Sequence, residues 1–201
     1  MATRKGYRNH PKSKTGVAGK MNIYLGLVHY PFLNKFNDIV TTSITNLDIH
    51  DIARTCKTFG IKKYFIINPL ETQKLLLDRI LKFWKSDNAE IYNSDRVTAL
   101  SEIEYSDSVE NTIECIKNQE EECPVTITTT AANLEAQISI SEFKKITKPI
   151  LILFGTGNGL APEIHNKADF ILSPIIGNTG YNHLSVRSAA AIVLDRLTSE
   201  K

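Results

Sequence analysis

The sequence has few cysteines and no long hydrophobic run, and each shortage excludes a class of protein. Its three cysteines, Cys56, Cys115 and Cys123, lack C-x-x-C spacing, so we expect neither a disulfide framework nor a metal site. Its longest apolar runs, at 149–154 and 189–194, are far shorter than the ~20 residues of a membrane-spanning helix. No hydrophobic stretch near the start has the pattern of a secretory signal. These absences predict a cytoplasmic protein without metal or membrane.

Basic and acidic side chains nearly balance over the whole chain, because 24 lysines and arginines against 22 acidic residues leave a net charge of only +2. Residues 1–20 are the exception, because they hold six lysines and arginines and no acid, so the remainder carries −4. With few apolar side chains, this segment cannot bury a core. We interpret residues 1–20 as a basic flexible arm that contacts nucleic-acid phosphates, or as a linker or solubilising tail. Residues 21–201 then form one domain.

Apolar runs of strand length alternate with helical patterns from Met21 onward. The patterns predict strands at 22–29, 63–68, 125–130, 150–154 and 170–173, and helices at 48–59, 71–85 and 184–197. Gly60 is placed to end one of these helices in the left-handed conformation. The acidic stretch 94–122 is expected to hold two short helices. This alternation predicts an α/β domain with a mostly parallel sheet and helices on both faces.

Three loops that follow expected strands are the candidate ligand-binding segments, because open parallel sheets bind ligands beyond the carboxyl ends of their strands. Residues 128–131 are rich in hydroxyls, 154–160 carry three alternate glycines, and 174–183 form a long glycine-bearing loop. Glycine lets the backbone approach a ligand closely and adopt positive φ. The G-x-G-x-G spacing differs from the G-x-G-x-x-G of nicotinamide-binding folds, so a nucleotide-dependent oxidoreductase is the weaker interpretation.

The expected helix at 48–59 carries Arg54, whose guanidinium fork suits a phosphate. Its spacing alone favours a simpler explanation, a surface ion pair with Asp51. The segment DIHDIARTCKTFG at 48–60, however, resembles the first motif of the SPOUT class of RNA methyltransferases, in which an arginine precedes Thr and, five residues on, Phe-Gly. Residues 154–160 resemble the second motif of that class. Residues 174–177 and 184–191 resemble the third.

A closer resemblance is to a stand-alone SPOUT subfamily that is sometimes fused behind a tRNA guanine methyltransferase domain. It is carried by VHYP at 28–31, TSITNL at 42–47 and NHLSVR at 182–187. The resemblance implies methylation of tRNA or rRNA, a C-terminal trefoil knot, a homodimer, and S-adenosyl-L-methionine bound in the knot. It also implies that Arg54 and Ser185 are catalytic, with Arg54 reaching a cofactor across the dimer interface. The implied cofactor-binding residues are Thr128, Thr129, Thr130, Phe154, Gly155, Thr156, Gly157, Gly159, Ile175, Ile176, Gly177, Asn182, His183 and Leu184.

Three positions depart from the pattern of many SPOUT ribose methyltransferases. Asp48 stands where they have Asn, Thr156 where they have Glu, and Ser185 where they have Asn. The acceptor therefore stays open between a ribose 2′-hydroxyl and a base nitrogen. A noncatalytic RNA-binding module that retains the fold is the alternative function.

The sequence leaves the roles of four further side chains undecided. His29, His50 and His183 are candidates for polar contacts or proton transfer, and each is also explained as a hydrogen-bonded structural residue. Arg187, near the start of the last helix, contacts either RNA or solvent.

Overall fold

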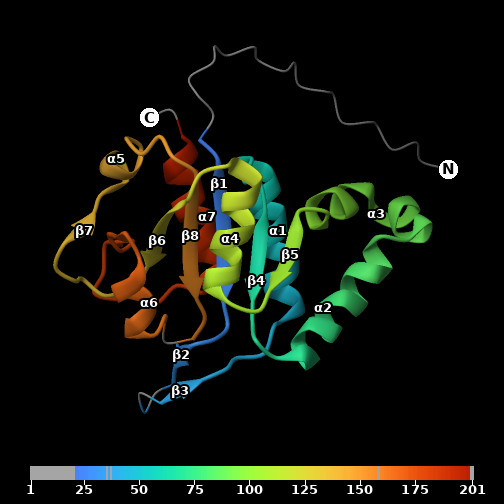
Figure 1. Cartoon of the computed structure of the whole chain (residues 1–201), viewed down its shortest axis with the longest axis horizontal. Coiled ribbons are helices and arrows are strands. Elements are labelled where there is room, and N and C mark those ends of the chain that lie inside the picture. Colours follow the sequence, from blue (N-terminus) through green and yellow to red (C-terminus); the bar gives the residue numbers. More distant parts are fainter. Residues whose placement is uncertain (1–20, 35, 37, 158, 200–201) are drawn as a thin grey trace, which may run out of the picture.

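The computed structural model describes residues 21–34, 36, 38–157 and 159–199, so the basic arm expected at 1–20 lies outside the described residues. One sheet consists of β1 (Ile23–Val28), β4 (Tyr64–Ile67), β5 (Ile103–Ser106), β6 (Val125–Thr129), β7 (Gln137–Ile138), β8 (Ile150–Gly155) and β9 (Phe170–Leu172). All its pairings are parallel, and the strand order is β5-β4-β1-β8-β6-β9-β7 (Figure 1). A separate antiparallel pair joins β2 (Phe32–Leu33) to β3 (Ile39–Val40).

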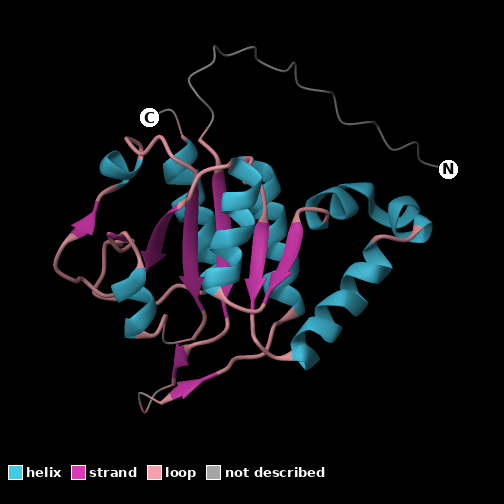
Figure 2. Ribbon diagram, viewed as in Figure 1, coloured by secondary structure: helices cyan, strands magenta, loops and turns pink. Residues whose placement is uncertain are grey.

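Helices cover both faces of the sheet, as predicted. They are α1 (Asn46–Phe59), α2 (Glu71–Trp84), α3 (Asp87–Leu100), α4 (Val109–Glu120), α5 (Ile140–Phe143), α6 (Pro162–Lys167) and α7 (Val186–Thr198). Side chains of α1 and α7 join the larger hydrophobic cluster on one face, and those of α4 and α6 join the smaller cluster on the other. Figure 2 shows α4 in front of the strands and α7 behind them. Among the described residues, no helix is long and apolar enough to cross a membrane.

Helix α1 has a clear start and end in the sequence. Thr45 is its N-cap, and the Thr45 hydroxyl accepts a hydrogen bond from the Asp48 amide at 3.1 Å. At the other end Gly60 adopts φ 70°, and the Ile61 amide donates to the Cys56 carbonyl at 2.9 Å. The prediction that Gly60 ends this helix is confirmed. Apolar residues every three or four positions between these caps face the larger cluster.

The prediction for the acidic stretch 94–122 is wrong in one respect. Between the end of α3 and the start of α4 lies strand β5, which pairs with β4 from Tyr64↔Ile103 to Ile67↔Ser106. It is an edge strand of four residues, and its acidic Glu104 forms an ion pair with Lys63. A strand this short within an acidic segment gives too weak an alternating pattern to be recognised. The structure also adds β2, β3, β7, α5 and α6, which have two to six residues and are too short for a repeating pattern to be recognised.

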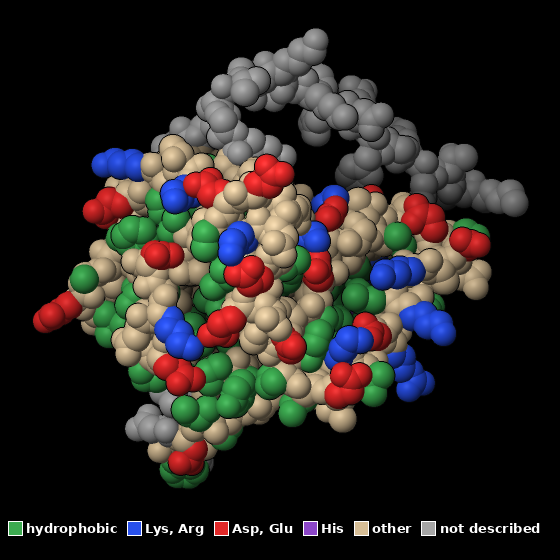
Figure 3. Space-filling view, viewed as in Figure 1, with side chains coloured by type: hydrophobic (Ala, Val, Ile, Leu, Met, Phe, Trp, Pro, Cys, Tyr) green, Lys and Arg blue, Asp and Glu red, His purple; other side chains and the backbone are tan. Residues whose placement is uncertain are grey.

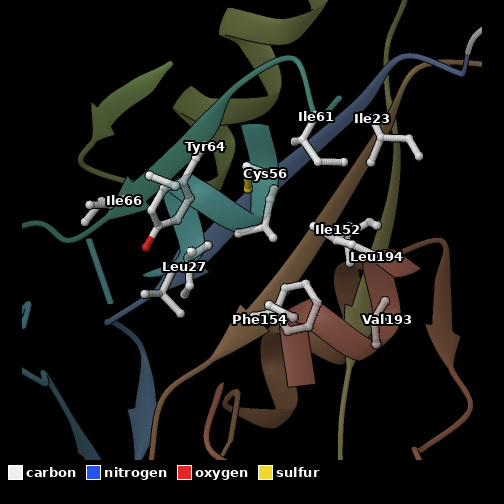
Figure 4. Close-up of a cluster of buried hydrophobic side chains, with 14 of the residues drawn as sticks. Ile23, Leu27, Cys56, Ile61, Tyr64, Ile66, Ile152, Phe154, Val193 and Leu194 are labelled. Carbon is white, nitrogen blue, oxygen red and sulfur yellow. The ribbon is translucent and has the colours of Figure 1, made fainter. Parts of the chain in front are cut away.

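The larger cluster fixes the position of α7 against the carboxyl half of β8. Figure 4 shows Ile152 and Phe154 of β8 beside Val193 and Leu194 of α7. Each of these four side chains is at most 4% exposed. The packing therefore holds the first turn of α7 next to the end of β8, where one of the glycine-bearing loops begins.

Candidate active site

A cavity of about 790 Å³ lies at the carboxyl ends of β6, β8 and β9. Its volume falls within the range of ~300–1,000 Å³ that is usual for small-molecule sites. The walls come from residues 42–48 before α1, from the loops after the three strands, and from the first turns of α7. This is the edge of a parallel sheet at which a ligand site is expected.

Most of the residues predicted for the cofactor come together in this cavity. Those that line it are Thr129, Thr130, Phe154, Gly155, Thr156, Gly157, Gly159, Ile175, Asn182, His183 and Leu184, together with Ser185. Thr128, Ile176 and Gly177 are not among the lining residues. Thr128 is fully buried and lies 2.8 Å from His165 Nδ1 through its hydroxyl, whereas Ile176 is 68% exposed. Neighbouring residues of β6 point to opposite faces, which separates Thr128 from Thr129.

The glycines after β8 are required by close packing and by backbone conformation. A Cβ atom on Gly155 would lie 2.7 Å from the Leu160 nitrogen. Gly157 has φ +54°, and a Cβ atom there would lie 2.4 Å from the Phe32 ring. Gly159 has φ +105°, a conformation that side chains rarely adopt. The loop therefore presents bare backbone to the cavity.

A short chain of hydrogen bonds leads from the cavity wall to a buried histidine. The hydroxyls of Thr42 and Thr156, which both line the cavity, are 2.7 Å apart. His29 Nδ1 lies 3.0 Å from the Thr42 hydroxyl, and His29 itself is fully buried behind the wall. Among buried side-chain nitrogen and oxygen atoms of the described residues, only His29 Nε2 has no hydrogen-bond partner.

Burial lowers the pKa of His29 to about 4, although the negative charge of Asp48 opposes this shift. The imidazole is therefore neutral near pH 7. A neutral ring cannot act as a cation toward a ligand, but its Nδ1 holds the Thr42 hydroxyl as a hydrogen-bond donor or acceptor, according to the tautomer. His29 is thus a buried hydrogen-bonding residue that supports Thr42, and through it Thr156.

Asp48 joins the cavity to an ion-pair network between α1 and α7. The Thr45 hydroxyl donates to Asp48 Oδ2 at 2.6 Å. Arg187 Nε lies 3.9 Å from Asp48 Oδ1, and Arg187 Nη1 lies 3.7 Å from Asp51 Oδ2. Arg187 is therefore engaged within the chain. The expected ion pair between Asp51 and Arg54 is absent from the described residues, since Asp51 faces Arg187 instead.

Arg54 is exposed on α1 and lies outside the cavity. It lines a separate hollow of about 360 Å³ with Asp51, Thr55, Thr58 and Phe59. Within the part of the chain that the structure describes, its guanidinium makes no hydrogen bond or ion pair. The structure of one chain therefore separates Arg54 from the residues predicted to bind the cofactor.

The other two histidines occupy different settings. His183 lines the cavity and packs edge-on against Tyr181, with ring centroids 5.5 Å apart. His50 instead packs against Trp84 at 5.3 Å, and its Nδ1 lies 3.4 Å from Arg96 Nη1. Burial first, and then the charge of Arg96, lowers the pKa of His50. His50 is a structural residue by this geometry.

Sequence reasoning missed one wall of the cavity. Thr42, Ser43, Thr45 and Asp48 line it, yet the predicted cofactor set contains no residue before Thr128. The hydroxyl-rich run TTSIT at 41–45 is the signal that was available, but only the packing of α1 against α7 and the contact of Thr42 with Thr156 bring it to the site. Among the described residues, no group of three His, Cys, Asp or Glu side chains is placed to hold a metal ion.

Comparison with known proteins identifies the family to which a chain with this cavity is similar. Residues 22–199 match the model of a family described as SAM-dependent RNA methyltransferase. The chain is 43% identical over 181 residues to a tRNA (guanine-N(1)-)-methyltransferase of Oleidesulfovibrio alaskensis, covering 89% of this chain and 42% of that protein. It is 36% identical to an uncharacterized protein of Aquifex aeolicus, covering 89% of each chain. The chain thus spans less than half the length of the named curated relatives that it matches.

Solved structures share the fold at low sequence identity. A probable methylase family protein from Haemophilus influenzae Rd KW20 superposes with a TM-score of 0.59 at 19% identity, covering 89% of this chain and 65% of that one. The SpoU methyltransferase AviRb from Streptomyces viridochromogenes superposes with a TM-score of 0.54 at 13% identity, covering 89% and 58%. The predicted α/β fold is confirmed. Since the family model spans nearly all of the described residues, the chain belongs to the family of S-adenosylmethionine-dependent RNA methyltransferases.

Proposed function

We propose that this chain transfers the methyl group of S-adenosylmethionine to a nucleotide of tRNA in the cytoplasm, with the cofactor held in the cavity beside β6, β8 and β9. One observation carries the proposal: residues of 154–160, which resemble the second SPOUT motif, and of 174–177 and 184–191, which resemble the third, line a single cavity. The choice of tRNA is supported by the name of the curated relatives, tRNA (guanine-N(1)-)-methyltransferase. The three free cysteines are compatible with a reducing compartment.

The residues present suit this cofactor. Gly155, Gly157 and Gly159 line the cavity without side chains, so a nucleoside can approach the main chain closely there. Leu172, Ile175 and Leu184 add apolar surface. The Asp48 carboxylate adds negative charge at the wall, which complements a cationic ligand. When bound, S-adenosylmethionine supplies a methyl group activated by a positively charged sulfur.

Arg54 and Ser185 are assigned to the substrate side of the site. Ser185 is the N-cap of α7, and its hydroxyl accepts from the Ser188 amide at 3.3 Å while it lines the cavity. A guanidinium offers only hydrogen-bond donors, so Arg54 positions a phosphate or a developing oxyanion rather than removing a proton. Because Arg54 lies outside the cavity of its own chain, this role requires a homodimer in which Arg54 reaches the cavity of the other copy. The trefoil knot stays a prediction of the resemblance.

The assay is transfer of labelled methyl from S-adenosylmethionine to unmodified tRNA and to rRNA fragments, followed by mass mapping of the modified nucleosides. We expect incorporation into tRNA, and the mapping identifies the nucleotide and the atom. Binding of S-adenosylhomocysteine without any transfer would instead support the noncatalytic RNA-binding module, which the replacements at Thr156 and Ser185 favour.

Arg54→Ala separates the substrate side from the cofactor side. We expect methylation to be abolished while calorimetry finds the affinity for S-adenosylhomocysteine nearly unchanged. Arg196→Ala removes another exposed arginine, on α7, and is the matched control. A large loss of cofactor affinity in Arg54→Ala would reject the assigned role.

Mixing two inactive variants tests whether Arg54 acts on the other copy. One chain carries Arg54→Ala, and the second carries Gly155→Leu, whose side chain would clash with the 159–160 backbone at the cavity wall. In a mixed dimer the intact cavity receives Arg54 from its partner, so an equal mixture regains about a quarter of the parent activity. A mixture that stays inactive, although light scattering finds mixed dimers, contradicts the arrangement.

A further inference from the structure

We propose that the outward face of α2, with Tyr92 of α3, is a docking surface for single-stranded RNA that leads to the cavity. This inference rests on the proposed function and specifies how the RNA is held. We call it the α2–α3 surface and define it by Arg79, Lys82, Phe83, Lys85 and Tyr92. Figure 3 shows lysine and arginine side chains gathered over this part of the molecule.

The cations of the α2–α3 surface have no partners in the described part of the chain. Arg79, Lys82 and Lys85 are exposed and form no ion pair or side-chain hydrogen bond there. The neighbouring acid Asp78 is already paired with Lys74 at 2.8 Å. The described body is acidic overall, so three unpaired cations, two on α2 and one at its C-cap, are a local exception. Such a stripe is suited to the phosphates of a nucleic acid.

Aromatic rings continue this surface at the end of α2. Phe83 is 54% exposed and Tyr92 is 77% exposed, so both present their rings to solvent. Trp84 lies between them, with its ring centroid 5.2 Å from that of Phe83 and 6.3 Å from that of Tyr92. The Arg96 guanidinium packs over Trp84 at 5.5 Å and holds it in place. Fixed, exposed rings next to cations form the arrangement that binds unpaired bases by stacking.

The spacing of these side chains places them within reach of one strand. Arg79, Lys82 and Phe83 are three and four positions apart and so are neighbours on the surface of α2. The acidic residues Asp87 and Glu90 lie in the first turn of α3, so the run of unpaired cations ends at Lys85. A strand that follows the cations along α2 therefore meets the Phe83 ring without crossing the acidic turn.

Helix α2 begins at the rim of the cavity. The Gln73 side-chain oxygen accepts hydrogen bonds from the Ile44 amide at 2.8 Å and from the Ser43 hydroxyl at 3.2 Å. Ser43 lines the cavity. The helix has 14 residues and extends about 20 Å away from this contact. An RNA strand held along α2 is therefore directed at the residues that line the cavity.

Apolar side chains at Leu75 and Ile91 also lie exposed nearby, so a protein partner or a second copy is the competing occupant. The unpaired cations favour RNA, because burying three unpartnered charges against an apolar protein surface costs free energy. The two occupants give different results when the charges are removed.

The test is binding of an unmodified tRNA transcript to the full chain over a series of salt concentrations. The triple variant Arg79→Gln, Lys82→Gln, Lys85→Gln should bind at least ten-fold more weakly at low salt, and its salt slope should fall by about two to three. Cofactor affinity should not change. The matched control is Lys117→Gln, Lys148→Gln, Lys167→Gln, which removes the same charge from surface ion pairs elsewhere. The control should keep the parent slope.

Phe83→Leu tests stacking with little change in apolar volume, and it should weaken RNA binding about five-fold or more. Thermal unfolding of each variant establishes that it is folded. Parent-like RNA affinity and salt slope in the triple variant would overturn the inference. A change in oligomeric state without a change in RNA binding would also overturn it and identify a protein interface.

The readouts separate this inference from the proposed function. If the parent chain binds RNA through α2 but transfers no methyl group, the proposed enzymatic function fails and the docking surface stands. If the parent methylates tRNA and the triple variant keeps the same KM, the docking surface fails and the function stands.

Discussion

Replacing Gly155 with alanine tests whether close packing at the end of β8 excludes a side chain at this position. A Cβ atom at this position would lie 2.7 Å from the Leu160 nitrogen and 2.8 Å from the Gly159 carbonyl carbon, whereas ordinary contacts begin at 3.4 Å. Both neighbours are main-chain atoms, so neither can rotate away as the end of a flexible side chain does. The strand end and the 159–160 segment must separate by about 0.7 Å to accept the methyl group.

The size of the effect follows from this separation. Overfilling a packed site costs about 1–3 kcal/mol, and 1 kcal/mol shifts the melting temperature of a domain of this size by about 2–4 °C. We therefore expect Gly155→Ala to melt about 2–12 °C below the parent. Because Gly155 lines the cavity, displacement of its backbone should also weaken binding of S-adenosylhomocysteine about ten-fold or more.

The assays are thermal unfolding by circular dichroism and calorimetric titration with S-adenosylhomocysteine. Gly180→Ala is the matched control, because a Cβ atom there has no neighbour within 4 Å and its φ is not positive. It should behave as the parent does in both assays. If Gly155→Ala melts within 1 °C of the parent and binds the ligand equally, the argument from close packing is wrong.

Two further predictions concern buried polar groups. The parent's free energy of unfolding should fall by up to about 3 kcal/mol as pH drops from 6.5 toward 4, because an unfolded histidine binds a proton that His29, with a pKa of about 4, does not. His29→Gln should flatten part of this fall in urea titrations, and an unchanged pH profile would contradict the assignment. Glu120→Ala leaves the buried Tyr24 hydroxyl without its acceptor and should cost about 1–3 kcal/mol. Glu110→Ala loses only an exposed pair with Lys167 and should cost less than about 1 kcal/mol in the same titrations, so equal losses would refute the reasoning.

The elements that sequence reasoning predicted well are those with a long pattern. Apolar residues of α1 recur over 14 residues between Thr45 and Gly60, so both the buried face of this helix and its end could be predicted from the sequence. The apolar run at 150–154 was predicted as a strand, and its side chains join the hydrophobic clusters on both faces of the sheet. Strand β5 was missed because Ile103 and Tyr105 are the only apolar positions of a four-residue edge strand.

The site was predictable where it depends on loops after strands, and unpredictable where it depends on packing between distant segments. Gly155 and Asn182 meet in one cavity because parallel strands end at one edge. Thr42 reaches the same cavity through a hydrogen bond to Thr156 across 114 positions, and no local pattern specifies such a contact. The pairing of Arg187 with Asp48 and Asp51 likewise depends on how α7 lies against α1.

The placement of α7 has a consequence for biosynthesis. Helix α7 supplies Val186, Ala189 and Val193 to a cavity that Thr42 also lines, so residues from nearly the whole length of the described chain meet there. On the ribosome, the earlier strands emerge first, and a binding site of this kind is absent until the last helix has emerged and docked. Nascent chains that lack α7 therefore have no pocket for a nucleoside. In a protein truncated before α7, S-adenosylhomocysteine should give no protection against proteolysis.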